Sequence, residues 1–191
     1  MEHRIAVFLS KNGVCAEEDI DIYEYGLTAI FSTVYTTAAL LITGILLHRL
    51  PETLTFILVF VLLRGQSGGY HADSRIGCLA TTFICYAASV YLSVLISAGI
   101  GSRVYAVVAA ICIVILAVLA PGDNPNKRIP KERIPRFKCR SVIIATAMAV
   151  ISFWFGYIIQ AVTVSAILCV VLLLIYSKFR RRSETNEEKG C

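Results

Sequence analysis

Long apolar runs separated by short polar segments make up most of the chain. Residues 26–47 form the first run, which as a helix is long enough to cross a hydrocarbon core of about 30 Å. Residues 78–100 and 104–120 form two further runs with a short turn between them. Residues 142–177 would measure about 54 Å as one helix, so we expect two spans with a turn near residues 156–160.

The run at residues 54–63 is shorter than the others. Its ten strongly apolar residues account for about 15 Å of helix, roughly half of a bilayer. Either the helix continues through Thr53 and Arg64 to a polar, partly buried end, or the segment is re-entrant. We favour the span, with Arg64 in a water-filled pocket or reaching the headgroups as a snorkelling anchor.

Charged segments flank the apolar runs, and we interpret residues 1–191 as one membrane domain. In the arm at residues 1–24, Ile5, Phe8 and Leu9 can share one side of a small interfacial helix, although a simple solvated arm is the alternative. The bundle at residues 26–177 contains a basic loop at 121–141, in which closely spaced prolines argue against a regular helix. The charged tail at residues 178–191 is expected to be disordered.

Composition and charge distribution agree with a membrane protein. Hydrophobic residues make up 57% of the chain, and the mean hydropathy is +0.73. With six spans and a cytoplasmic N-terminus, sixteen Lys and Arg fall in cytoplasmic segments and only Arg49 and Arg103 fall outside. A re-entrant 54–63 segment would remove this asymmetry. The sequence therefore predicts an all-α polytopic membrane protein with about six transmembrane helices and cytoplasmic N- and C-termini.

Cysteine and motif content limits the chemistry that we expect. Seven cysteines without regular spacing do not indicate a disulfide framework, and Cys85, Cys112 and Cys169 fall in apolar runs where a thiol packs as a small hydrophobic group. Neither an HExxH motif nor a phosphate-binding Gly-Lys-Ser/Thr loop occurs. We therefore expect no metal, no cofactor and no nucleic-acid partner.

The polar island at residues 64–78, RGQSGGYHADSRIGC, interrupts the apolar pattern and contains His71 and Cys78. An imidazole can take the proton of a nearby thiol, and the first turn of a helix favours the thiolate. Asp73 or Ser74 can cap the helix that begins near Cys78. In one continuous helix the two side chains would lie about 10 Å apart, so His71 must fold back over the helix start, which the glycines allow. The alternative is a polar loop beside a structural thiol.

Other groups in the island can support such chemistry. Gln66, Ser67 and the backbone amides of Gly68 and Gly69 are possible oxyanion donors. Asp73 is a possible third member beside His71, with an N-cap role as its alternative. A dyad without a third member is chemically sufficient for a thiol nucleophile.

Two motifs resemble those of the accessory gene regulator B (AgrB) family, membrane cysteine endopeptidases that mature quorum-sensing pro-peptides. In the island, the order and spacing of the family are matched by Arg64, Gly68-Gly69, His71-Ala72 and Cys78. In the basic loop, the match consists of Pro121 and Asn126-Lys127, with Arg128 where a proline is expected. The resemblance covers most of the chain.

This resemblance implies an activity and a set of partners. Cys78 would be the nucleophile and His71 the base in cleaving the C-terminal part of a small AgrD-like pro-peptide, followed by thiolactone or lactone closure from an acyl-enzyme. An acidic segment of the peptide would dock on Lys127, Arg128, Lys131 and Arg133; otherwise these cations only set topology and attract anionic lipid. The resemblance further implies a homodimer in the bacterial cell membrane.

Two other functions fit the same apolar pattern. The first is a small peptide or solute exporter without catalytic activity, in which residues 64–78 form a re-entrant gate. The second is an enzyme that modifies lipids. A Cys78→Ala variant separates the exporter from a protease, because a gate tolerates the change whereas a thiol protease loses all cleavage. A lipid-modifying enzyme would process lipid extracts rather than peptide.

Overall fold

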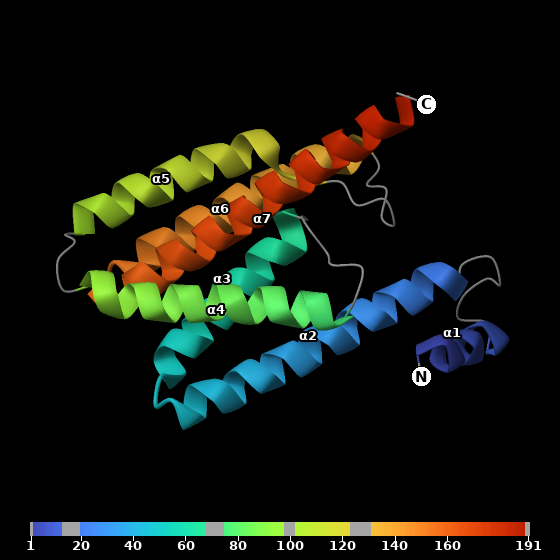
Figure 1. Cartoon of the computed structure of the whole chain (residues 1–191), viewed down its shortest axis with the longest axis horizontal. Coiled ribbons are helices and arrows are strands. Elements are labelled where there is room, and N and C mark those ends of the chain that lie inside the picture. Colours follow the sequence, from blue (N-terminus) through green and yellow to red (C-terminus); the bar gives the residue numbers. More distant parts are fainter. Residues whose placement is uncertain (1, 13–19, 68–74, 98–101, 123–130, 190–191) are drawn as a thin grey trace.

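The computed structural model describes residues 2–12, 20–67, 75–97, 102–122 and 131–189. Within these residues every regular element is a helix, which confirms the predicted all-α membrane class (Figure 1). The elements in chain order are α1 (Glu2–Lys11), α2 (Ile20–Leu46), α3 (Leu50–Ser67), α4 (Arg75–Ser97), α5 (Ser102–Leu119), the short 3-10 helix η2 (Lys131–Arg133), α6 (Ile134–Ser152) and α7 (Tyr157–Lys189).

Helices α2 to α7 correspond to the six predicted apolar runs. By length and composition, four segments of the described chain can cross a membrane: Gly26–Leu46, Leu50–Ser67, Ile76–Val94 and Tyr157–Arg180. Helix α5 contributes a shorter apolar segment, Arg103–Leu119. Helix α6 is less apolar because its first two turns carry Arg136, Lys138 and Arg140.

The short apolar run at residues 54–63 is part of a longer helix. Helix α3 continues past it in both directions, through Thr53 at one end and Arg64 at the other, to give 18 residues. At about 1.5 Å per residue this is close to the thickness of a hydrocarbon core. The helix therefore has the extended form that the sequence favoured over a re-entrant segment.

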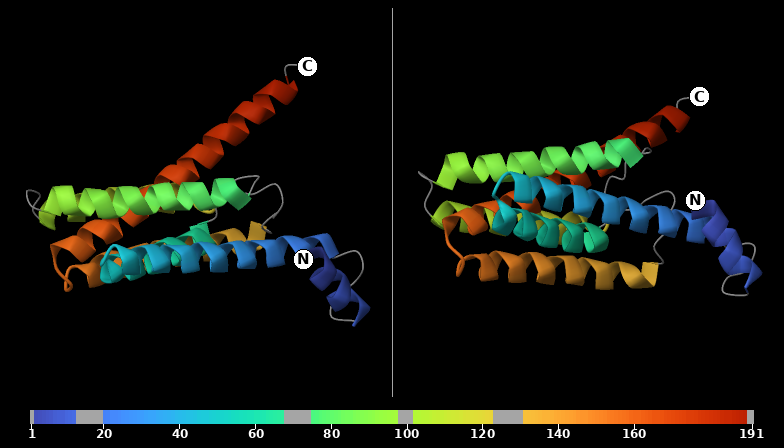
Figure 2. Two further views of the ribbon diagram at one scale, coloured as in Figure 1. Left: turned by 60° about the horizontal axis from the view of Figure 1, so that its bottom comes forward. Right: turned by 90° about the horizontal axis from the view of Figure 1, so that it is seen from below.

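Helix α7 lies at the centre of the bundle, where it packs against α3, α4 and α5 (Figures 1 and 2). Its buried residues are small or β-branched over most of its length, including Ala161, Val162, Ala166 and Val170. Small side chains allow neighbouring helix backbones to approach closely in a membrane bundle. Helix α3 contributes Phe56, Phe60 and Leu63 to the same buried core.

Three local predictions differ from the structure. The turn between α6 and α7 occupies Phe153–Gly156, earlier than expected, because Gly156 adopts a φ of +89° that favours glycine. Helix α6 begins inside the proline-rich segment, since Pro135 lies in its first turn, where no backbone donor is needed. The tail is helical as far as Lys189, since no proline or glycine interrupts α7 before Gly190.

Helix α1 confirms that the arm contains a short helix. It lies beside the N-terminal part of α2 (Figures 1 and 2). Ile5 is half-buried and Phe8 is exposed. The side chain of Leu9 lies outside the described part.

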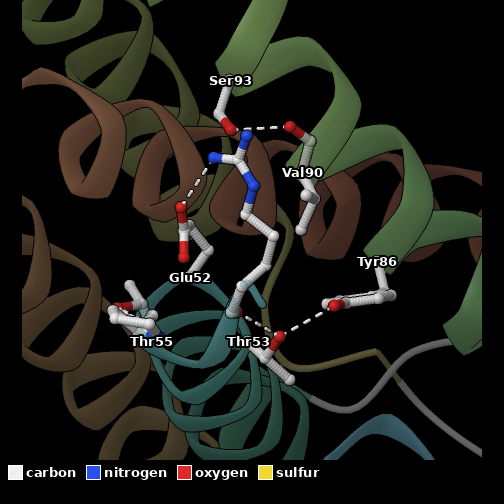
Figure 3. A network of polar contacts seen from close by, with 8 residues as sticks. Glu52, Thr53, Thr55, Tyr86, Val90 and Ser93 are labelled. Atoms are coloured by element: carbon white, nitrogen blue, oxygen red, sulfur yellow. Dashed lines mark hydrogen bonds and ion pairs between the residues drawn. The ribbon is translucent and has the colours of Figure 1, made fainter. Parts of the chain in front are cut away.

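The N-terminal end of α3, which lies farthest from Arg64, packs closely against α2 and α4. A Cβ added at Gly44 of α2 would lie 2.7 Å from the Cβ of Thr53, and closer still to its Oγ1. The fully buried Thr53 hydroxyl is hydrogen-bonded to the hydroxyl of Tyr86 on α4 at 2.7 Å (Figure 3). A glycine is therefore needed at position 44, because the side chain of Thr53 occupies the space that a Cβ would need.

We predict that Gly44→Ala destabilises the protein by about 1–3 kcal/mol, because the added methyl group overpacks the contact with Thr53. Unfolding in mixed micelles measures the change in free energy. Gly26→Ala in the same helix is the matched control, since no atom lies within 4 Å of the added Cβ. In the control, the free energy of unfolding is expected to rise by about 0.5–1 kcal/mol, because alanine has a higher helix propensity than glycine. Equal effects of the two substitutions would contradict the close approach.

Candidate functional site

The structure describes only part of the polar island. Helix α3 contributes Arg64, Gln66 and Ser67, and Cys78 lies in the first turn of α4, as predicted. Several predicted site residues lie outside the described part of the chain, namely Gly68, Gly69, His71, Asp73, Lys127 and Arg128. The structure therefore does not report the distance between His71 and Cys78.

Arg64 lies in the last turn of α3 and reaches α4. Its guanidinium is placed 5.3 Å from the centre of the Phe60 ring, in a cation–π arrangement. Cys78 and Cys85 of α4 are its electrostatic neighbours. The charge of Arg64 is therefore directed toward the bundle and α4, which a side chain extended only to the headgroups would not do.

Cys78 is half-buried, and its backbone is held by the regular hydrogen bonds of α4. The Thr82 hydroxyl donates to the Cys78 carbonyl at 2.9 Å, one turn further along the helix. The first turn of a helix carries N–H groups without intrahelical partners, and anions in general bind well at such positions. A rigid helix start and a nearby guanidinium are both suited to a thiolate nucleophile.

Two further thiols lie where α4 packs against α7. The Cys169 thiol donates to the backbone carbonyl of Cys85 at 3.9 Å, and its sulfur lies 3.9 Å from the Ser89 hydroxyl. The sequence predicted only that these thiols pack as small hydrophobic groups, a role that the buried Cys112 fulfils. No sequence signal pairs Cys169 with Cys85, because the two residues lie 84 positions apart.

Gln66 and Ser67 lie at the end of α3. Ser67 is fully buried, and its carbonyl accepts a hydrogen bond from the Gly122 N–H at 2.7 Å. The buried Oε1 of Gln66 accepts no hydrogen bond from the described residues. The Ser67–Gly122 contact places the start of the basic loop beside the start of the polar island, an arrangement that sequence spacing alone could not reveal.

Of the four predicted peptide-docking cations, two fall in η2. Lys131 begins this short helix, although its side chain lies outside the described part, and Arg133 is exposed at its end, directly before α6. Exposure leaves the Arg133 guanidinium accessible to an anionic partner.

Among the described residues, no three side chains of His, Cys, Asp or Glu lie close enough together to hold a metal ion.

The family model "Accessory gene regulator B" matches residues 2–177 of the chain. The chain belongs to the AgrB family. This membership associates it with the peptide processing of the accessory gene regulator system. No solved structure matches the chain.

Two relatives carry AgrB-like names that are themselves provisional. A protein of Lactiplantibacillus plantarum is 20% identical over 96% of this chain and 92% of its own length. A protein of Clostridium perfringens strain 13 is 29% identical over 59% of this chain and 55% of its own length. The first alignment includes nearly the whole of both chains.

We predict that Arg64→Leu slows the alkylation of Cys78 by iodoacetamide about threefold to tenfold, because the sulfur loses a neighbouring positive charge. Quantitative mass spectrometry of the Cys78 peptide measures the rate. Arg49→Gln is the matched control: it removes a cation at the opposite end of α3, where Arg49 pairs with Glu52 at 3.0 Å. Equal rates in Arg64→Leu and the unaltered protein would show that Arg64 does not act on this sulfur.

Proposed function

We propose that this AgrB-family protein is a membrane-embedded cysteine endopeptidase that cleaves the C-terminal part of a small quorum-sensing pro-peptide and promotes its cyclisation. The observation that carries the proposal is the placement of Cys78 in the first turn of α4, with the guanidinium of Arg64 close to its sulfur. The family match over residues 2–177 supports a peptide of the AgrD type as the substrate.

Cleavage begins when His71 takes the proton of the Cys78 thiol. The sulfur attacks the carbonyl carbon of the scissile peptide bond, and the tetrahedral intermediate expels the amine, which receives the proton from His71. The product of this half-reaction is a thioester between Cys78 and the N-terminal part of the peptide. Gln66, Ser67 and the amides of Gly68 and Gly69 are the candidate donors to the oxyanion.

Cyclisation completes the reaction without a further energy source. His71 takes the proton of a thiol or hydroxyl of the bound peptide as that group attacks the thioester carbonyl. The ring closes as a thiolactone or lactone, and the Cys78 sulfur leaves and regains a proton from His71. The thioester retains much of the driving force of acyl transfer as long as water does not reach it first. The half-buried position of Cys78 supports cyclisation ahead of hydrolysis, because the residue is partly shielded from water by its neighbours.

The proposal includes an orientation in the bacterial cell membrane. With α2 to α7 as six spans and both termini in the cytoplasm, the C-terminal ends of α3 and α5 and the N-terminal ends of α4 and α6 meet at the cytoplasmic side (Figure 1). The Lys and Arg distribution supports this orientation. We propose a homodimer as the assembled form, following the family resemblance.

We predict that co-expression of the protein with an AgrD-like pro-peptide releases a C-terminal fragment that Cys78→Ala and His71→Ala do not release. Loss of the nucleophile or the base is expected to lower cleavage by at least a factor of about 10³. Mass spectrometry of the peptide measures the fragment. A hydroxylamine-sensitive adduct on the Cys78 peptide would identify the thioester.

Cys139→Ala is the matched control, since Cys139 is an exposed thiol on α6 and takes no part in the proposed chemistry. Normal release by this variant excludes a general effect of removing a thiol. Equal release by all variants would overturn the protease assignment, and residues 64–78 would then be tested as the gate of an exporter. Conversion of lipid instead of peptide would favour a lipid-modifying enzyme.

We further propose that Lys127, Arg128, Lys131 and Arg133 bind an acidic segment of the pro-peptide. The combined change of these four residues to Gln is predicted to raise the KM for cleavage about tenfold or more with little change in kcat, because uniform binding is lost. The effect should shrink as salt is raised, since exposed charges are screened. Lys178→Gln, which removes an exposed cation of α7, is the control. An unchanged KM would leave these four cations with a role in topology or lipid attraction alone.

A further inference from the structure

The interface between α4 and α7 contains two thiols that the proposed cleavage chemistry does not use. The Cys169 thiol donates to the Cys85 carbonyl at 3.9 Å, and the Ser89 hydroxyl lies at the same distance from the Cys169 sulfur. The thiol groups of Cys85 and Cys169 are also electrostatic neighbours of each other. The two cysteines are therefore in direct contact across the interface.

This contact lies close to the arrangement that a disulfide bond needs. In a disulfide, the Cβ atoms of the two cysteines lie within about 4.5 Å of each other. The carbonyl oxygen of a residue is only three bonds from its own Cβ, so the Cys169 sulfur already lies beside the backbone that carries the Cys85 thiol. Rotation of the two side chains is therefore the main movement that bond formation requires.

The position of the two thiols determines which oxidant can reach them. Cys85 lies within Ile76–Val94 and Cys169 within Tyr157–Arg180, two segments that are long and apolar enough to cross a membrane. Cys85 is buried, whereas Cys169 is only half-buried and offers the route of access. A charged oxidant such as glutathione disulfide enters a bilayer poorly, because its charges lose their hydration, whereas an uncharged quinone dissolves there.

We propose that Cys85 and Cys169 form a redox-active thiol pair, which a lipid-soluble quinone oxidises to a disulfide that holds α4 against α7. Two S–H bonds break and one S–S bond forms. Two electrons and two protons pass to the quinone, which leaves as the hydroquinone. Quinones accept electrons from protein thiols elsewhere in the bacterial envelope. The inference is independent of the proposed protease activity, because it concerns other thiols.

The first test uses the full-length protein in phosphatidylcholine vesicles, with every thiol reduced at the start. The vesicles are treated with duroquinone, whose fully methylated ring has no free position for a stable thioether. The remaining thiols are then blocked with N-ethylmaleimide in denaturant, and the peptides are analysed by mass spectrometry. Cys85 is expected to be linked to Cys169 in most molecules. Recovery of both thiols as maleimide adducts would overturn the proposal.

Two variants and a second oxidant serve as controls. Cys169→Ser is expected to abolish the link, whereas Cys112→Ser, which removes another buried thiol, leaves it unchanged. Glutathione disulfide at the same concentration is expected to form the link about tenfold more slowly or less, because it is charged. Equal rates with the two oxidants would exclude the bilayer quinone as the preferred oxidant, and a link from Cys85 to any other cysteine would contradict the pairing.

The contact itself can be measured without oxidation. Dibromobimane becomes fluorescent when both of its arms react with closely spaced thiols. It is expected to bridge Cys85 and Cys169 in the unaltered protein and to give no such product in Cys169→Ser. A reagent that reacts with Cys169 in the unaltered protein and never reaches Cys85 would show that the thiols are not in contact, and would overturn the proposal.

The effect of the link on the bundle is measured by thermal unfolding. A disulfide between positions 84 apart restricts the unfolded chain, so the oxidised protein is expected to unfold about 5 °C or more above the reduced protein. Reducing agent should reverse the shift, and Cys169→Ser treated with duroquinone should not show it. An unchanged unfolding temperature in molecules that carry the link would overturn its role in holding α4 against α7.

Discussion

A guanidinium at the end of an apolar helix must be accommodated within the bundle, and this requirement determines how α3 meets α4. Arg64 lies over the Phe60 ring, and its electrostatic neighbours on α4 are Cys78 and Cys85, whose sulfurs are polarisable groups. Leu63 and Ser67, close to Arg64 in the same helix, are fully buried, so this end of α3 is packed into the bundle. The positive charge of Arg64 thus acts on the part of α4 that bears these thiols.

Much of this architecture could be predicted, because the length of each apolar run is a strong signal for a helix in a membrane protein. Each apolar run lies within one of the helices, or two in the case of the longest run, and Cys78 was correctly placed in a first helical turn. Arg64 was recognised as a candidate because a charge beside an apolar run is costly unless it has a partner. Helix ends were less predictable: Pro135 lies within α6, and α7 continues through a charged segment that has no helix breaker.

Contacts between distant residues could not be predicted from spacing. The hydroxyl pair of Thr53 and Tyr86 joins positions 33 residues apart, and the hydrogen bond from the Cys169 thiol to the Cys85 carbonyl joins positions 84 residues apart. Each residue looks ordinary alone, since a threonine, a tyrosine or a cysteine is common in an apolar run. Its partner is decided by helix packing around α7, which a single sequence does not encode in any local pattern.

The uninterrupted course of α7 also has a mechanical consequence. Its residues 181–189 follow the apolar segment as nine further helical residues, which extend about 14 Å beyond it as a stiff rod (Figure 2). This exceeds the screening length of about 8 Å at physiological salt. For a span whose apolar segment ends at the bilayer surface, the first turn of such an extension lies within reach of the surface potential, whereas its last turn lies beyond it.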